Sequence, residues 1–150
     1  MRALRLPVLL SAVVLLALSG CRSEAQTPTV TVYKSPTCGC CVLWADHMTA
    51  SGFTVESVDV ASMDDVKARL GVPNTLASCH TAVVGDYVVE GHVPAEDVER
   101  LLAEQPDAAG LAVPGMPIGS PGMEVEGRPA DSYDVFLFTR DGRASVFSHH

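Results

Sequence analysis

Three cysteines lie within four consecutive residues, Cys38-Gly39-Cys40-Cys41, and a fourth, Cys79, precedes a second apolar stretch. Thiolates exchange disulfide bonds and bind soft metal ions such as Cu(I) and Zn²⁺. Cys38 and Cys41 have the C-x-x-C spacing of thiol redox motifs. Cys40 adds a sulfur that such a motif does not use, so the pattern favours a metal site.

The cysteine cluster follows a predicted strand and opens a predicted helix. Residues 30–33 are β-branched or aromatic, as in a strand, and the next four residues turn the chain into a helix that begins near Cys38. The N-terminus of a helix carries free N–H groups and about half a positive charge, which stabilises a thiolate. Cys38 is therefore the best-placed thiolate of the cluster.

The remaining patterns predict a strand over 53–60, a helix from 63 to 70, strands over 81–84 and 87–90, and a helix from Pro94 to about 103. This βαβαββα order predicts an α/β fold of the thioredoxin-like type. In that arrangement the loop before the third strand faces the cysteine turn and usually carries a cis-proline. Here it carries Ser78-Cys79-His80, so we expect four sulfurs to converge and substrate disulfides to dock poorly.

A segment rich in proline and glycine, 106–129, follows the last helix and repeats one motif, Pro114-Gly115-Met116 and Pro121-Gly122-Met123. Such a long loop in a compact domain is commonly functional or packed. The thioethers of Met116 and Met123 suit Cu(I) if the loop folds over the cysteines, although methionine also fills gaps in cores. Residues 133–139 and 143–147 predict a closing β-hairpin.

Residues 1–20 have the basic start, apolar centre and small-residue end of an export signal. The sequence Leu18-Ser19-Gly20-Cys21 resembles a lipobox, which predicts lipidation of Cys21 and a tether over 21–29. We therefore expect a periplasmic protein anchored to a membrane. No acidic residue follows Cys21 directly, which favours the outer membrane over the inner one.

The mature chain of about 120 to 130 residues suits one domain, here 30–150. Without Arg2 and Arg5 the formal net charge falls from -8 to -10. Such a chain repels phosphate backbones, so nucleic acid is excluded as a partner and metal ions are favoured.

Several motifs together resemble the CopG family of thioredoxin-like periplasmic proteins linked to copper resistance. They are residues 33–41 with the cysteines, Trp44 with His47-Met48, residues 78–82, residues 90–95 and the Pro-Gly-Met pair. The resemblance implies copper binding by Cys38, Cys40, Cys41 and Cys79, redox handling of the ion, and copper-handling proteins of the periplasm as partners.

The histidines are weaker ligand candidates. His47 lies about 10 Å along the helix from Cys40, too far to share its ion. His80 adjoins Cys79, where it either points away or supports the site as a neighbour of the ligands. We expect His92 to bond local backbone groups, and His149 and His150 to form a solvated tail.

Three functions remain open. The first is copper binding for copper tolerance, with Cu(I) as the ion and zinc as the alternative. The second is thiol–disulfide oxidoreductase activity, in which Cys38 attacks and Cys41 resolves. The third is a structural domain that a disulfide of Cys79 holds together.

Overall fold

The structure, a computed structural model, describes residues 28–150. The signal peptide predicted over 1–20, the predicted lipidation site Cys21 and most of the tether lie outside the described residues. Within 28–150, no helix is both long enough and apolar enough to span a bilayer.

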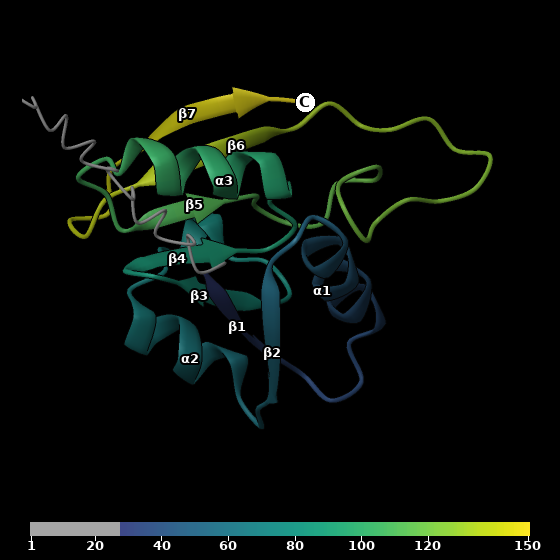
Figure 1. Ribbon diagram of the computed structural model, residues 1–150, viewed down its shortest axis with the longest axis horizontal. Helices are drawn as coiled ribbons and strands as arrows, with labels where there is room; N and C mark the ends of the chain where they lie inside the picture. The colour runs from purple at the N-terminus through teal and green to yellow at the C-terminus, as the bar shows by residue number, and fades with distance from the viewer. Residues whose placement is uncertain (1–27) are drawn as a thin grey trace, which may run out of the picture.

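Within the described residues, seven strands form one mixed sheet (Figure 1), in the order β2-β1-β3-β4-β5-β6-β7. The sheet is parallel between β1 and β2 and between β4 and β5, and antiparallel at the other pairings. The strands are β1 (Thr29–Lys34), β2 (Thr54–Asp59), β3 (Thr81–Val84), β4 (Tyr87–Glu90), β5 (Gly110–Ala112), β6 (Asp134–Phe138) and β7 (Ala144–His149).

The helices are α1 (Gly39–Ala50), α2 (Met63–Leu70) and α3 (Ala95–Glu104), with a 3₁₀ turn, η1 (Asn74–Leu76), before β3. The order of strands and helices predicted from the sequence is confirmed as far as α3. Ser62 caps α2 by accepting a hydrogen bond from the Asp65 amide, and Gly71 ends the helix in the left-handed conformation. The chain is thus a mixed α/β protein.

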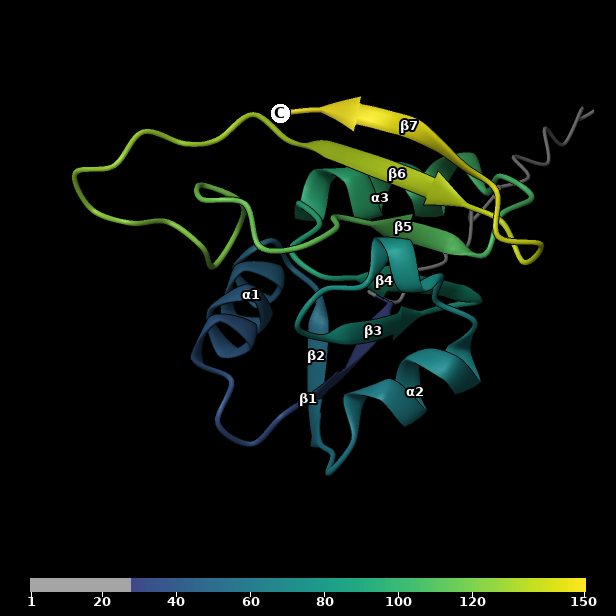
Figure 2. The same cartoon turned by 180° about the vertical axis from the view of Figure 1, so that it is seen from behind.

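Two apolar cores cover the two faces of the sheet. Successive strand residues point to opposite faces, and in β4 Val89 packs in one core while Val88 packs in the other. The first core joins α1 and α3 through Trp44, Met48, Val98 and Leu101. The second contains Val72 and Leu76, near α2 and η1. Figures 1 and 2 show these two sides of the sheet.

The sequence did not predict β5, which lies inside the proline- and glycine-rich segment. Its three residues are too few to show a periodic pattern, and its first residue, Gly110, has low strand propensity. The glycine is required because a Cβ there would lie 1.8 Å from the carbonyl oxygen of Val88 in β4. The rest of the segment is a loop that extends past the sheet (Figures 1 and 2).

The predicted C-terminal hairpin is confirmed as the antiparallel pair β6 and β7.

We expect Gly110→Ala to lower the free energy of unfolding by at least about 3 kcal/mol, because β5 must move away from β4 and the β6–β7 hairpin with it. Gly39→Ala is the matched control, since a Cβ at Gly39 meets no atom within 4 Å. Urea unfolding of both reduced variants measures the difference. Equal stabilities would contradict the pairing of β5 with β4.

Candidate metal centre

The pairing of β1 with β3 brings the predicted cysteines together. Tyr33 lies opposite Thr81 in an antiparallel register, so the turn after β1 and the loop before β3 lie at the same edge of the sheet. Cys38 is the N-cap of α1, and its side chain makes no capping hydrogen bond. Cys40 and Cys41 occupy the first turn, and Cys79 faces them from the opposite loop.

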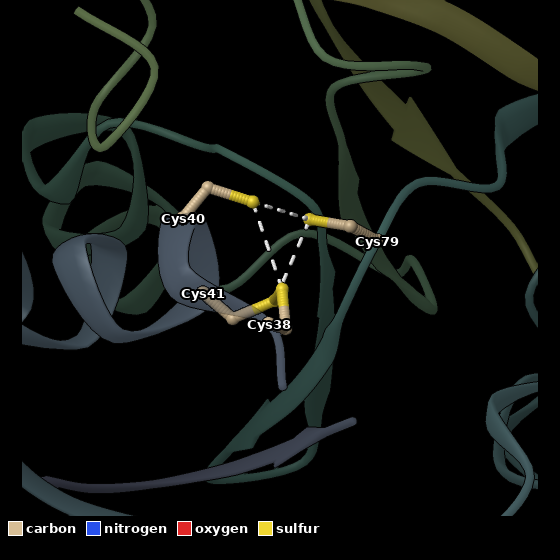
Figure 3. A group of neighbouring side chains, drawn as sticks. All are labelled: Cys38, Cys40, Cys41 and Cys79. Atoms are coloured by element: carbon tan, nitrogen blue, oxygen red, sulfur yellow. Dashed lines mark hydrogen bonds between the residues drawn. A yellow bond between two sulfur atoms is a disulfide. The ribbon is translucent and has the colours of Figure 1, made fainter. Parts of the chain in front are cut away.

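The four sulfurs form one cluster (Figure 3), in which all four Sγ atoms lie within 4.8 Å of one another. The Sγ–Sγ distances are 3.6 Å from Cys38 to Cys40, 3.9 Å from Cys40 to Cys79 and 3.7 Å from Cys41 to Cys79. Cys38 and Cys41 form a disulfide, whereas Cys40 and Cys79 are free thiols. The structural alternative, a disulfide of Cys79, is therefore wrong.

The spacing of the sulfurs fits a tetrahedral metal ion. Two sulfurs that each lie about 2.3 Å from such an ion are about 3.8 Å apart. Three of the five non-bonded sulfur pairs are separated by 3.6, 3.7 and 3.9 Å. Binding by all four sulfurs requires reduction of the Cys38–Cys41 bond, because a metal ligand must be a thiolate. The disulfide and a four-thiolate metal site therefore exclude each other.

Two buried histidines extend the cluster beyond the cysteines. Cys79 Sγ lies 3.0 Å from Nε2 of His92 and 3.3 Å from Nδ1 of His80, and the three residues form a second group with metal-binding geometry. Nε2 of His80 is buried and has no hydrogen-bond partner. Cys79 is therefore shared by a sulfur-rich group and a group rich in imidazole nitrogen.

The sequence prediction for His92 was wrong. Its Nδ1 donates to the carbonyl oxygen of Pro121, far along the chain, and its Nε2 faces Cys79. The register of the β3–β4 hairpin could have indicated the contact between His92 and Cys79. Thr81 pairs with Glu90, so the residues just after β4 lie beside those just before β3. His80 lies against Cys79 rather than on the opposite face.

Burial controls the protonation of the centre. It raises the pKa of the Cys79 thiol from 9.0 to about 12, together with a smaller contribution from the neighbouring Cys40. Burial lowers the pKa of His92 below its ordinary value, and that of His80 far below it, with smaller contributions at His80 from His92 and Lys67. Both imidazoles are neutral near pH 7 and keep a lone pair for a metal.

The proline- and glycine-rich loop packs on the cysteine turn. Gly122 has a φ of +82°, and a Cβ there would lie 2.8 Å from the Trp44 amide nitrogen and 2.9 Å from the Cys40 carbonyl oxygen. Met123 follows in this docked turn and is partly buried, while Met116 is 53% exposed. Their role as copper ligands remains a prediction.

The other histidines lie away from the sulfurs. His47 accepts a hydrogen bond from the amide of Ala95 at the start of α3. This packing role agrees with the prediction that His47 does not share a metal ion with Cys40. His149 and His150 are both exposed, as expected of a solvated tail, but Nε2 of His150 also lies 2.7 Å from Oδ2 of the buried Asp97. His149 is exposed and lies against Asp134.

Comparison with known proteins adds three findings. The family described as "Protein of unknown function, DUF411" matches residues 76–123. Two solved structures, forms 2 and 1 of a copper resistance protein CopG, are each 47% identical to this chain. They align with 83% of this chain and with 99% and 98% of their own lengths, with TM-scores of 0.79 and 0.78. No curated protein sequence matches the chain.

We expect alkylation of Cys79 by iodoacetamide to accelerate about tenfold per pH unit from pH 7 to pH 10 without levelling off, because only the thiolate reacts and the pKa is about 12. Mass spectrometry of the protein with its Cys38–Cys41 disulfide intact measures the rate. Urea-unfolded protein is the control, and its rate should level off near pH 9. A plateau there in the folded protein would contradict the raised pKa.

Proposed function

Because this chain belongs to the CopG-like family, we propose that it binds copper for copper tolerance through Cys38, Cys40, Cys41 and Cys79. The observation that carries the proposal is the convergence of four sulfurs within 4.8 Å of one another, with three of the sulfur pairs at separations that suit a tetrahedral ion. The two structures that the chain resembles are named for copper resistance. His80 and His92 add neutral nitrogen ligands at the shared Cys79.

The ligand set favours Cu(I). Soft thiolates select Cu(I), and an imidazole suits copper in either oxidation state as well as zinc. Binding through the free thiol of Cys79 must release its proton, so the affinity should fall as the pH falls. Zinc is the weaker competitor for the same four sulfurs.

The cysteine pair that forms the disulfide gives the centre redox capacity. The thiolates of Cys38 and Cys41 can give up one electron each to two Cu(II) ions, which yields the disulfide and two Cu(I) ions. Cys40, Cys79 and the two imidazoles remain as ligands after this step. We therefore include interconversion of Cu(II) and Cu(I) in the proposal, together with sequestration and transfer to periplasmic copper-handling proteins.

A thiol–disulfide oxidoreductase is the second candidate, and the Cys38–Cys41 disulfide at a helix N-terminus favours it. The element order up to α3 supports a thioredoxin-like fold, in which such motifs are common. Within residues 28–150, however, every peptide bond is trans. The loop opposite the motif presents Cys79 instead of a cis-proline, so we propose that general disulfide reduction is a minor activity.

We propose that the chain is anchored in the periplasm by a lipid on Cys21, at the outer membrane rather than the inner one. The proposal is supported by the signal-like residues 1–20, the lipobox-like residues 18–21 and the absence of an acidic residue directly after Cys21.

Competition with a chromophoric Cu(I) chelator tests copper binding. The reduced protein should keep Cu(I) in the presence of equimolar Zn²⁺. Cys40→Ser and Cys79→Ser should each lower the Cu(I) affinity by more than about 100-fold. A smaller loss, of about 10- to 100-fold, is typical of residues that support a ligand without binding the metal. The Cys38–Cys41 disulfide should still form in Cys40→Ser, because Cys40 takes no part in it.

An insulin-reduction assay on the same proteins separates the two candidates. Unchanged copper affinity in both serine variants, with efficient disulfide reduction by the wild type, would establish the oxidoreductase and reject the copper site.

The anchor has its own test. We expect Cys21→Ser to move the protein from the membrane to the soluble periplasmic fraction, because lipidation requires the cysteine thiol, while the copper content of the protein stays unchanged. Cell fractionation with metal analysis measures both. Retention of the variant in the membrane fraction would reject the lipid anchor without affecting the copper site.

A further inference from the structure

A buried ionic cluster lies directly behind the Cys79 loop. The Glu90 side chain at the end of β4 has no exposed surface. Its Oε1 accepts hydrogen bonds from Lys67 Nζ at 2.5 Å and from the Ser78 amide at 2.6 Å, and its Oε2 accepts one from Thr81 Oγ1 at 2.6 Å. Lys67 Nζ also donates to Thr81 Oγ1 at 3.0 Å. Residues of α2, β3 and β4 thus converge on one backbone amide next to Cys79.

Stability alone does not explain this cluster. Removing two charges from water is costly, and an apolar pair of similar volume often serves a fold equally well. The carboxylate is fully hydrogen-bonded by a cation, a hydroxyl and an amide, which is the condition for tolerating a buried charge. Its specific effect is geometric, because it fixes the position of the Ser78 amide.

The segment Glu90-Gly91-His92 holds the Cys79 loop at successive points. Besides the Glu90 contact, the Gly91 amide donates to the His80 carbonyl oxygen at 3.0 Å, and His92 Nε2 lies 3.0 Å from Cys79 Sγ. Gly91 has a φ of +71°, and a Cβ there would collide with the Ser78 side chain. The end of β4 therefore fits closely against the backbone on both sides of Cys79.

We propose that Glu90 is a positioning residue for Cys79: its carboxylate, neutralised by Lys67, fixes the loop so that the Cys79 sulfur lies opposite the three cysteines of the α1 turn. This inference deepens the proposed copper function and rests on it. Neither Glu90 nor Lys67 belongs to the two groups with metal-binding geometry. Removal of such supporting contacts typically lowers metal affinity about 10- to 100-fold.

Two double variants isolate the contact with Ser78. Lys67→Met/Glu90→Gln and Lys67→Met/Glu90→Leu both remove the ion pair and keep similar volumes. Only glutamine retains an oxygen that can accept the Ser78 hydrogen bond. Val135→Ala, a cavity variant in the core of β6, is the control for a loss of stability away from the Cys79 loop.

Cu(I) affinity of each reduced protein is measured by chelator competition, at a temperature at which circular dichroism shows the protein folded. We expect the glutamine double variant to stay within about threefold of wild type and the leucine double variant to bind at least about tenfold more weakly. Val135→Ala should bind like the wild type. Equal affinities of the two double variants would overturn the proposal, as would an equal loss in Val135→Ala.

A metal-free measurement separates this inference from the copper function. Hydrogen exchange of the Ser78 amide in the apo-protein should be faster in the leucine double variant than in the glutamine one, and unchanged in Val135→Ala. If wild type binds no Cu(I) while this exchange pattern holds, the copper function fails and the positioning of the loop stands. Equal exchange in both double variants would reject the positioning role.

Glu90→Asp decides the question if the leucine variant does not fold. Aspartate keeps the charge for Lys67 but is one methylene shorter, so it cannot reach both Lys67 and the Ser78 amide as glutamate does. We expect at least about a tenfold loss of Cu(I) affinity. Wild-type affinity and wild-type Ser78 exchange in this variant would overturn the proposal.

Discussion

The backbone register of three adjacent strands determines where the chemistry of this protein lies. Tyr33 of β1 lies opposite Thr81 of β3, and Thr81 lies opposite Glu90 of β4. These two pairs place the end of β1, the start of β3 and the end of β4 at one edge of the sheet. Cys38, Cys79 and His92 follow or precede those ends by only a few residues. A slip of one residue would turn every side chain of a strand to the other face, so the centre depends on main-chain hydrogen bonds more than on contacts among its own side chains.

Burial gives the centre a preference for cations. A thiolate isolated from water is unfavourable, as the raised pKa of Cys79 shows. A bound metal ion supplies the missing positive charge and allows the thiolate to form. The neutral imidazoles of His80 and His92 add donors without adding positive charge of their own. The same burial that keeps the Cys79 thiol protonated therefore favours a cation that binds sulfur well enough to displace the proton.

Local sequence patterns predicted most elements but only part of the site. Alternating apolar residues, a helix cap at Ser62 and the short turn between the predicted strands 81–84 and 87–90 can each be recognised within a few residues of sequence. The structure contains the corresponding helix and strands. The four cysteines were found because their residue type and spacing are distinctive. β5 depends on a close approach between Gly110 and Val88, two residues that are distant in the chain. His92 and Glu90 meet the Cys79 loop only once β3 and β4 are paired, and His150 meets Asp97 only through the C-terminal hairpin, so no pattern within a single element assigns these residues.

Residues that are not metal ligands control the centre from two sides. On the α2 face of the sheet, the Glu90 carboxylate holds the Ser78 amide. On the α1 face, the Pro121 carbonyl oxygen accepts the Nδ1 proton of His92, which leaves the Nε2 lone pair pointing at Cys79. A peptide oxygen can only accept, so this contact selects the imidazole tautomer whatever metal is bound. Cys79 is thus oriented through its backbone and faced by an imidazole of fixed tautomer before a metal arrives, and little reorganisation of this half of the site is needed on binding. Binding by all four sulfurs, by contrast, would require reduction of the Cys38–Cys41 disulfide, so the redox state of this pair determines how many sulfurs the centre can offer a metal ion.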